Sequence, residues 1–154
     1  MSGAEAAIAA MTAAGLEHVV TRHGPVRSLE EAAAARGVAP AALIKTMVVR
    51  RAEGDYLFVL VPGDRSISWP KLRELLGVSR LSMPDAATAK EVTGYERGTI
   101  TPFGASHAWP VIADSRVEGT VSIGAGAHGV AATADGAELV AALGAQQADV
   151  TEPA

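Results

Sequence analysis

The sequence predicts a mixed α/β (α+β) domain in which helices flank a mostly antiparallel sheet. Two runs rich in β-branched residues, 43–50 and 56–61, are separated by a short polar turn, which is typical of a hairpin. Further short strand patterns follow in the second half of the chain, and capped helix patterns interrupt them at irregular spacing. Since 154 residues suit one ordinary domain, we expect a single domain over residues 1–154.

The first elements precede the hairpin. Ile8 and Met11 lie three residues apart in an alanine-rich segment, which favours a short helix. Ser28 is followed three residues later by Glu31, a capping box that predicts a helix ending at Gly37. In chain order, we expect a helix at 4–14, a strand at 17–22, a turn at 23–25 and a helix at 28–37.

Helices and short strands follow the hairpin. Pro70 suits the first turn of a helix that begins after Ser68, and Asp85 is an N-cap residue for the next helix. The tail from Ala148 is expected to be frayed. In chain order, we expect helices at 68–76 and 86–91, a loop at 93–104, strands at 111–113, 120–123 and 130–133, and a helix at 136–143.

The composition limits the location of the protein. Apolar residues make up 49% of the chain and aromatic residues only 4%. The purely apolar run at residues 56–61, which no other run exceeds, is far shorter than the roughly 20 residues of a membrane-spanning helix. The start of the chain carries Glu5 and no basic segment, unlike a secretory signal peptide. We therefore expect a cytoplasmic location and no membrane partner.

The absence of cysteine and the net charge exclude several function classes. Without cysteine the chain has no disulfide, no thiolate nucleophile and no cysteine-containing zinc site. A net charge of -4 argues against the broad basic surface that binds duplex DNA, so no DNA partner is expected. A local basic pocket is compatible with this charge.

Two motif classes can be weighed directly. Residues 124–129 match G-x-G-x-x-G, a motif that binds dinucleotides where a helix begins at the glycines. Here a strand pattern follows the glycines, so a glycine-rich turn between two strands is a better interpretation. The histidines lack the spacing of metal ligands, and Ser106 lacks a nucleophile-elbow motif, so no metal, cofactor or serine triad is expected. The four histidines are His18, His23, His107 and His128.

Lys45 is the most informative single residue. Under the period of two of a strand it shares a face with Leu43, Met47 and Val49, which are all apolar. A lysine on such a face either extends its ammonium to the edge of the apolar surface or presents it to an anion, such as a phosphate or a developing negative charge. The residues alone leave both interpretations open.

The loop at 94–104 is the most specific segment. It has the form Gly-Tyr-x-x-Gly-x-x-x-Pro-x-Gly and can direct backbone N–H groups at one point. Together with Lys45-Thr46 and the later Gly126-x-x-Gly129, it resembles the YbaK-type aminoacyl-tRNA deacylases and the editing insertion of bacterial prolyl-tRNA synthetases. The resemblance covers the chain from about His23 to the final helix, and it implies a YbaK-like editing-domain fold.

The resemblance implies roles for individual residues. Lys45 matches the family's essential lysine, which holds a phosphate near the terminal adenosine of tRNA, and Gly98 and Thr99 would offer N–H groups to the ester. The remaining matched or neighbouring positions are expected to bind substrate. They are Thr21, His23, Thr46, Pro102, Gly126, His128 and Gly129.

The chain departs from its relatives at positions that would face the amino acid or the tRNA end. Thr21 stands where the cysteine-editing members have tyrosine, and Ala131 replaces an aspartate. Ala127 and His128 replace a Lys-Arg pair found in some relatives. Specificity for cysteinyl-tRNA therefore does not transfer to this chain.

The sequence leaves three hypotheses. The first is a trans-editing hydrolase that cleaves the ester between a wrong amino acid and the terminal ribose of tRNA, within the prolyl set, with the acceptor end and a synthetase as partners. The second is a non-catalytic module that binds tRNA or an aminoacyl-nucleotide. The third is a protein without such a ligand, in which Lys45 only extends past apolar neighbours.

Overall fold

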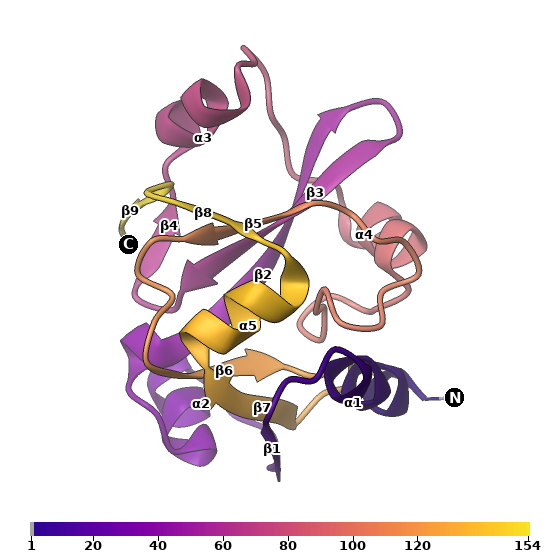
Figure 1. Ribbon diagram of the computed structural model, residues 1–154, viewed down its shortest axis with the longest axis vertical. Coiled ribbons are helices and arrows are strands. Elements are labelled where there is room, and N and C mark those ends of the chain that lie inside the picture. The colour runs from indigo at the N-terminus through magenta and orange to yellow at the C-terminus, as the bar shows by residue number, and fades with distance from the viewer. Residues whose placement is uncertain (1) are drawn as a thin grey trace.

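The computed structural model describes residues 2–154 and contains five α-helices and nine strands (Figure 1). The helices are α1 (Gly3–Ala13), α2 (Leu29–Arg36), α3 (Trp69–Leu76), α4 (Ala86–Thr93) and α5 (Gly136–Leu143), with a 3-10 turn η1 (Pro40–Ala42). The strands are β1 (Val19–Arg22), β2 (Leu43–Ala52), β3 (Asp55–Pro62), β4 (Arg65–Ile67), β5 (Val111–Asp114), β6 (Thr120–Gly124), β7 (Val130–Asp135), β8 (Gln146–Ala148) and β9 (Thr151–Pro153).

Seven strands form one mixed sheet in the order β1-β7-β6-β2-β3-β5-β8, and β4 pairs with β9 in a second, small sheet. The longest pairings are antiparallel and join β2 to β3, β6 to β7 and β1 to β7. Shorter parallel pairings join β2 to β6, β3 to β5 and β5 to β8. The mixed α/β class with a mostly antiparallel sheet is therefore confirmed.

Local signals placed the helices correctly. The Ser28 hydroxyl accepts a hydrogen bond from the backbone N–H of Glu31 at 3.1 Å, as the capping box predicts. Gly37 ends α2 in the left-handed conformation, with φ of 73°. Asp85 caps α4 in the same manner through the N–H of Thr88 at 2.8 Å.

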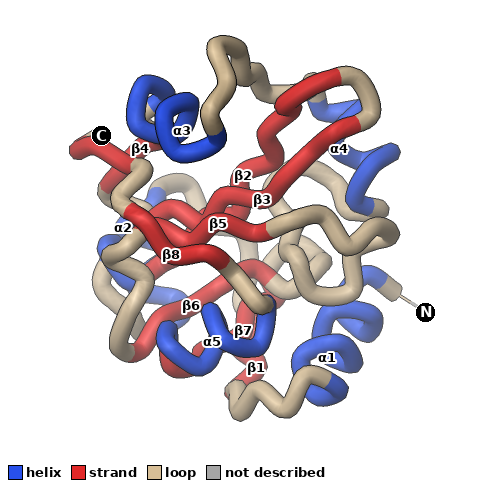
Figure 2. Tube along the Cα trace, turned by 45° about the horizontal axis from the view of Figure 1, so that its top comes forward, coloured by secondary structure: helices blue, strands red, loops and turns tan. Residues whose placement is uncertain are grey.

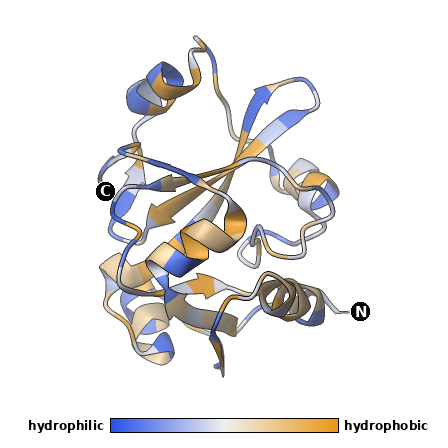
Figure 3. Ribbon diagram, in the orientation of Figure 1, coloured by the Kyte–Doolittle hydropathy of each residue, from blue (hydrophilic) through white to orange (hydrophobic). Residues whose placement is uncertain are grey.

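The hydrophobic core divides into two clusters on the two sides of the sheet. One contains Phe58, Ile123 and Leu139, and helices α1 and α5 contribute to it. The other contains Val59 and Leu72, and helix α3 contributes to it. Successive residues of β3 alternate between the clusters, so this strand is buried on both sides, and hydrophobic residues are concentrated on the central strands in Figure 3.

The expectation of a frayed tail from Ala148 is wrong. Strand β8 lies beside β5 (Figure 2), and β9 pairs with β4. Thr151 and the preceding Val150 are completely buried. Sequence patterning missed these strands because they are only three residues long and, in β8, polar.

No helix within residues 2–154 is long and apolar enough to cross a membrane.

Candidate functional site

The sheet opens between β2 and β6. Their parallel pairing ends at Ile44 and Ile123, and the other edge contact of β2 comes from Arg50, which forms a bridge with Ser82. In an antiparallel pair alternate residues turn their main-chain groups to opposite edges. The N–H and C=O groups of Arg50 bond to Ser82 and point away from β3. By alternation the main-chain groups of Thr46 and Val48 also point away from β3. Across residues 2–154 no strand pairs with β2 at these two residues.

A cavity of about 640 Å³ occupies this opening. Its walls come from β2, from the segment that leads into α4, from the loop after α4 and from the end of β6. Most of the lining is apolar, and four lining residues are charged. The lining residues are Arg36, Leu43, Lys45, Thr46, Met47, Val48, Met83, Pro84, Asp85, Ala86, Ala89, Arg97, Gly98, Ile100 and Gly124.

The charged lining residues make the cavity cationic although the chain is acidic. Arg36, Lys45 and Arg97 carry positive charge, whereas Asp85 is the one acidic residue of the lining. The Asp85 carboxylate is engaged in capping α4, which lowers its pKa through hydrogen bonds from Thr88. The net positive lining favours a ligand with negative charge.

Lys45 reaches the edge of the cavity. Its Nζ donates a hydrogen bond to the backbone carbonyl of Arg65 at 2.7 Å, and its side chain is half-buried. Burial lowers the pKa of the Lys45 ammonium from its ordinary value, and the negative charge of Asp64 opposes this shift. An ammonium has three N–H donors, so donors remain for a ligand after the contact with Arg65.

Arg36 was not predicted from the sequence. It lies at the last residue of α2, and its Nε is buried without a hydrogen-bond partner among the described residues. Burial lowers the pKa of its guanidinium, which nevertheless remains charged. The Thr46 hydroxyl in the same lining is also buried and unpaired. Both are therefore polar atoms without a hydrogen-bond partner within residues 2–154.

The loop after α4 is held in a fixed shape. The buried Tyr95 hydroxyl donates to the carbonyl of Phe103 at 2.7 Å, and Thr93 bonds both Ala89 and Tyr95. Gly98 lines the cavity in the left-handed region, with φ of 88°. A side chain is strained there, which explains why this position carries glycine.

Thr99 differs from the sequence-based expectation. Its N–H donates to the carbonyl of Glu96 at 2.9 Å, and the residue is only 3% exposed and outside the cavity lining. The Thr99 N–H is therefore already used within the loop and is not a free donor for an ester. Of the two N–H groups that the sequence predicted as donors to an ester, those of Gly98 and Thr99, only that of Gly98 remains a candidate.

The turn at 125–129 packs against this loop. The N–H of Gly126 donates to the carbonyl of Thr99 at 3.1 Å. A Cβ placed on Gly98 would lie 3.6 Å from the His128 ring, and His128 in turn lies 3.7 Å from a carboxylate oxygen of Glu96. The carbonyl of Gly129 accepts from the N–H of His23 at 2.9 Å.

Thr21 and Ala131, two of the positions that the resemblance set apart, are direct partners across β1 and β7. Ala131 also pairs with Gly124 of β6, which lines the cavity. Paired residues point to one face of a sheet, so these three residues form a row that leads to the cavity. Ala131 is fully buried, so a larger side chain there would need rearrangement.

Of the predicted site residues, Lys45, Thr46 and Gly98 line the cavity directly. The others do not line it: Thr21, His23, Thr99, Pro102, Gly126, His128 and Gly129. The structure adds three lining residues that the sequence did not predict: Arg36, Met83 and Arg97. They were missed because no local pattern distinguishes them from residues of an ordinary helix end or loop. Within residues 2–154 no cluster of His, Asp or Glu could hold a metal ion.

The sequence matches a family model described as the aminoacyl-tRNA editing domain over residues 23–144. The chain is 33% identical to the proline-tRNA ligase of Bacillus licheniformis over 69% of its length, and 37% identical to that of Heliobacterium modesticaldum over 74%. It spans only 18% and 19% of the lengths of these ligases.

Solved structures agree with this match. A hypothetical protein of 30% identity superposes with a TM-score of 0.83, covering 92% of this chain and 96% of the other. A protein assigned provisionally as a trans-editing enzyme for prolyl tRNA synthetase has 26% identity and a TM-score of 0.88, covering 99% of this chain and 98% of the other.

Proposed function

The chain belongs to the aminoacyl-tRNA editing domain family, and on this premise we propose that it is a trans-editing deacylase for mischarged tRNA of the prolyl set. One observation carries the proposal: a cationic cavity at an unpaired sheet edge, lined by Lys45 and by Gly98 at the positions that match the family motif. Its volume of about 640 Å³ suits the terminal nucleoside of a tRNA together with a small amino acid.

The tRNA end would bind through its phosphate. Lys45 has N–H donors left after its contact with the Arg65 carbonyl, and Arg36 has a guanidinium without an acidic partner among residues 2–154. Arg97 adds further positive charge to the lining. Because a phosphate accepts several charge-assisted hydrogen bonds, these cations can fix the acceptor end.

The chemistry requires few catalytic groups. An aminoacyl ester is already reactive, so orientation of the ester and stabilisation of the oxyanion can supply much of the rate acceleration. In this proposal the Gly98 N–H donates to the oxyanion while water attacks the carbonyl carbon. An attack by the adjacent ribose hydroxyl would only move the acyl group to that oxygen, so water must still complete the release of the amino acid. The C–O bond to the ribose then breaks, and the ribose oxygen leaves with a proton.

The amino-acid side chain would be selected mainly by size. Thr21 and Ala131 offer less hydrogen-bonding capacity than the tyrosine and aspartate of cysteine-editing relatives. A separate editing site is useful because one methylene group provides only about 1–3 kcal/mol of discrimination at a synthetase. Alanine and serine are therefore the expected amino acids.

The experiment is a time course of deacylation with a panel of mischarged tRNAs. We expect the wild-type protein to hydrolyse at least one member, and the folded Lys45→Ala variant to lose this activity. Arg51→Ala is the matched control, because Arg51 pairs with Asp55 at the hairpin and does not line the cavity.

The same experiment distinguishes the non-catalytic alternative. Binding of tRNA by a wild-type protein that releases no amino acid would indicate a binding module instead of a hydrolase. Unchanged hydrolysis by Lys45→Ala would remove the role proposed for this lysine.

A further inference from the structure

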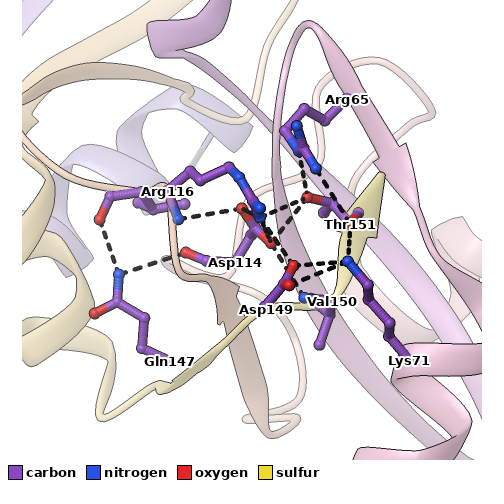
Figure 4. Close-up of polar contacts among 9 residues, drawn as sticks. Arg65, Lys71, Asp114, Arg116, Gln147, Asp149, Val150 and Thr151 are labelled. Atoms are coloured by element: carbon purple, nitrogen blue, oxygen red, sulfur yellow. Dashed lines mark hydrogen bonds and ion pairs between the residues drawn. The ribbon is translucent and has the colours of Figure 1, made fainter. Parts of the chain in front are cut away.

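The C-terminal strand is connected to Lys45 through β4. Strand β9 is the pairing partner of β4, with Ile67 opposite Thr151 and Arg65 opposite Pro153. The Arg65 side chain donates from Nε to the Thr151 hydroxyl at 2.7 Å and from Nη2 to the Thr151 carbonyl at 3.3 Å (Figure 4). The backbone carbonyl of the same Arg65 accepts the hydrogen bond from Lys45.

Thr151 is itself fixed from the other side. Its hydroxyl donates to a carboxylate oxygen of Asp114 at 2.9 Å, and the N–H of Val150 donates to the same oxygen at 3.2 Å. Thr151 and Asp114 are both completely buried. A hydroxyl has one proton and can also accept, so the Thr151 hydroxyl donates to Asp114 while it accepts from Arg65. Arg116 also donates to this hydroxyl, at 3.4 Å, so three charged partners define its position.

The outer side of this network is more exposed. Asp149 accepts hydrogen bonds from Lys71 and from Arg116, and Arg116 also contacts Asp114 (Figure 4). Exposed ion pairs contribute little on their own. The buried hydroxyl of Thr151 is therefore the connection whose removal tests the link between the C-terminal strand and β4.

We propose that the segment at 146–153 is a positioning element for Lys45 and acts through Thr151 and Arg65. This inference rests on the proposed function, and the segment lies beyond residues 23–144, where the family model matches. By holding β4, Thr151 fixes the Arg65 carbonyl, which in turn fixes one N–H donor of the Lys45 ammonium. The other donors then face a phosphate from a defined position.

The physical reason is the flexibility of lysine. A lysine side chain can adopt many rotamers, and a misplacement of about 1 Å at a reacting centre can lower the rate about 10²-fold. Strand β4 has only three residues, and β9 is its partner in a two-stranded sheet. Without the Thr151 hydroxyl, the Arg65 side chain keeps only its 3.3 Å contact with the Thr151 carbonyl.

The first test compares Thr151→Val with Thr151→Ser in the deacylation assay. Valine has nearly the same shape but no hydroxyl, and we expect it to lower kcat/KM by about 10-fold to 10²-fold. Serine keeps the hydroxyl and is expected to restore most of the activity. Gly77→Ala is the control for lost stability, because Gly77 ends α3 with φ of 66° and has no atom within 4 Å of its added Cβ.

The second test does not depend on activity. The chain has three lysines, Lys45, Lys71 and Lys90, so the 13Cε signals of labelled lysine can be assigned by substitution and followed against pH by NMR. In Thr151→Val we expect the Lys45 signal and its titration to change. Lys90 lies outside the network and is expected to stay unchanged.

Two results would overturn the inference: a folded Thr151→Val protein with wild-type kcat/KM and an unchanged Lys45 signal, or a Thr151→Ser protein as impaired as Thr151→Val. Failure of the proposed function gives a different result. In that case the wild-type protein would hydrolyse no mischarged tRNA, while the NMR comparison would still report whether Thr151 positions Lys45.

Discussion

Substitution of Gly98 by alanine separates a catalytic role of this glycine from a structural one. Gly98 has φ of 88°, a conformation that costs an L-residue about 1–2 kcal/mol. The added Cβ would lie 3.6 Å from His128, an ordinary contact, so no clash adds to this cost. For a chain of this size 1 kcal/mol lowers Tm by about 2–4 °C, so we expect a loss of about 2–8 °C.

The effect on the reaction should be much larger. A backbone that relaxes toward negative φ turns the Gly98 N–H away from its original direction. Removal of one oxyanion donor typically lowers kcat by about 10²–10³-fold. We therefore expect Gly98→Ala to lose most of its single-turnover deacylation rate at a temperature where it remains folded.

Gly77→Ala is again the matched control. Gly77 also has positive φ, it lies outside the cavity lining, and space surrounds it. We expect the two variants to show similar losses of Tm, with wild-type turnover in Gly77→Ala alone. A Gly98→Ala protein that loses Tm but retains the wild-type rate would refute the role of the Gly98 N–H.

Three further outcomes are expected. Salt should reduce kcat/KM less steeply in Arg36→Ala, because one phosphate contact to a single strand is lost. The magnitude of the negative slope of log kcat/KM against log salt concentration should fall by about 0.7. An unchanged slope would exclude that contact. Ala- and Ser-charged forms of one tRNA should both be hydrolysed, with preferences among Ala, Ser, Cys and Pro of about 10–200-fold; a strong preference for Cys alone would contradict selection by size. Asp149 has a pKa lowered to about 2 by Arg116 and Lys71, so its stabilising contribution is present above the ordinary value of 3.8 and is lost as pH falls through about 2. The difference in Tm between wild type and Asp149→Asn should therefore shrink on acidification, and a constant difference would argue against this linkage.

Helices and the hairpin could be predicted because their signals are local. Ser28 with Glu31 marks the start of α2 and Gly37 marks its end, and the β2–β3 pairing needs only a short turn. The small sheet of β4 and β9 could not be predicted, because its strands are short and far apart in sequence. Only the folded chain brings Arg65 beside Thr151.

The candidate site was predicted in part for the same reason. The family motif identified Lys45 and Gly98, and both line the cavity. The cavity itself depends on the separation of β2 from β6, a non-local feature without a sequence pattern. Arg36 was missed because a basic residue at the end of a helix is common and is usually explained by the helix dipole. The bonding of the Thr99 N–H within its own loop could only be seen in three dimensions.

The opening between β2 and β6 also bears on how the protein avoids self-association. An uncovered strand edge is a template on which another chain can add a strand and begin to aggregate. Here the uncovered stretch runs only from Ile44 to Arg50, and α4 and the loop that follows it form the opposite wall of the cavity. An extended polypeptide that paired with Thr46 and Val48 would therefore have to displace this wall.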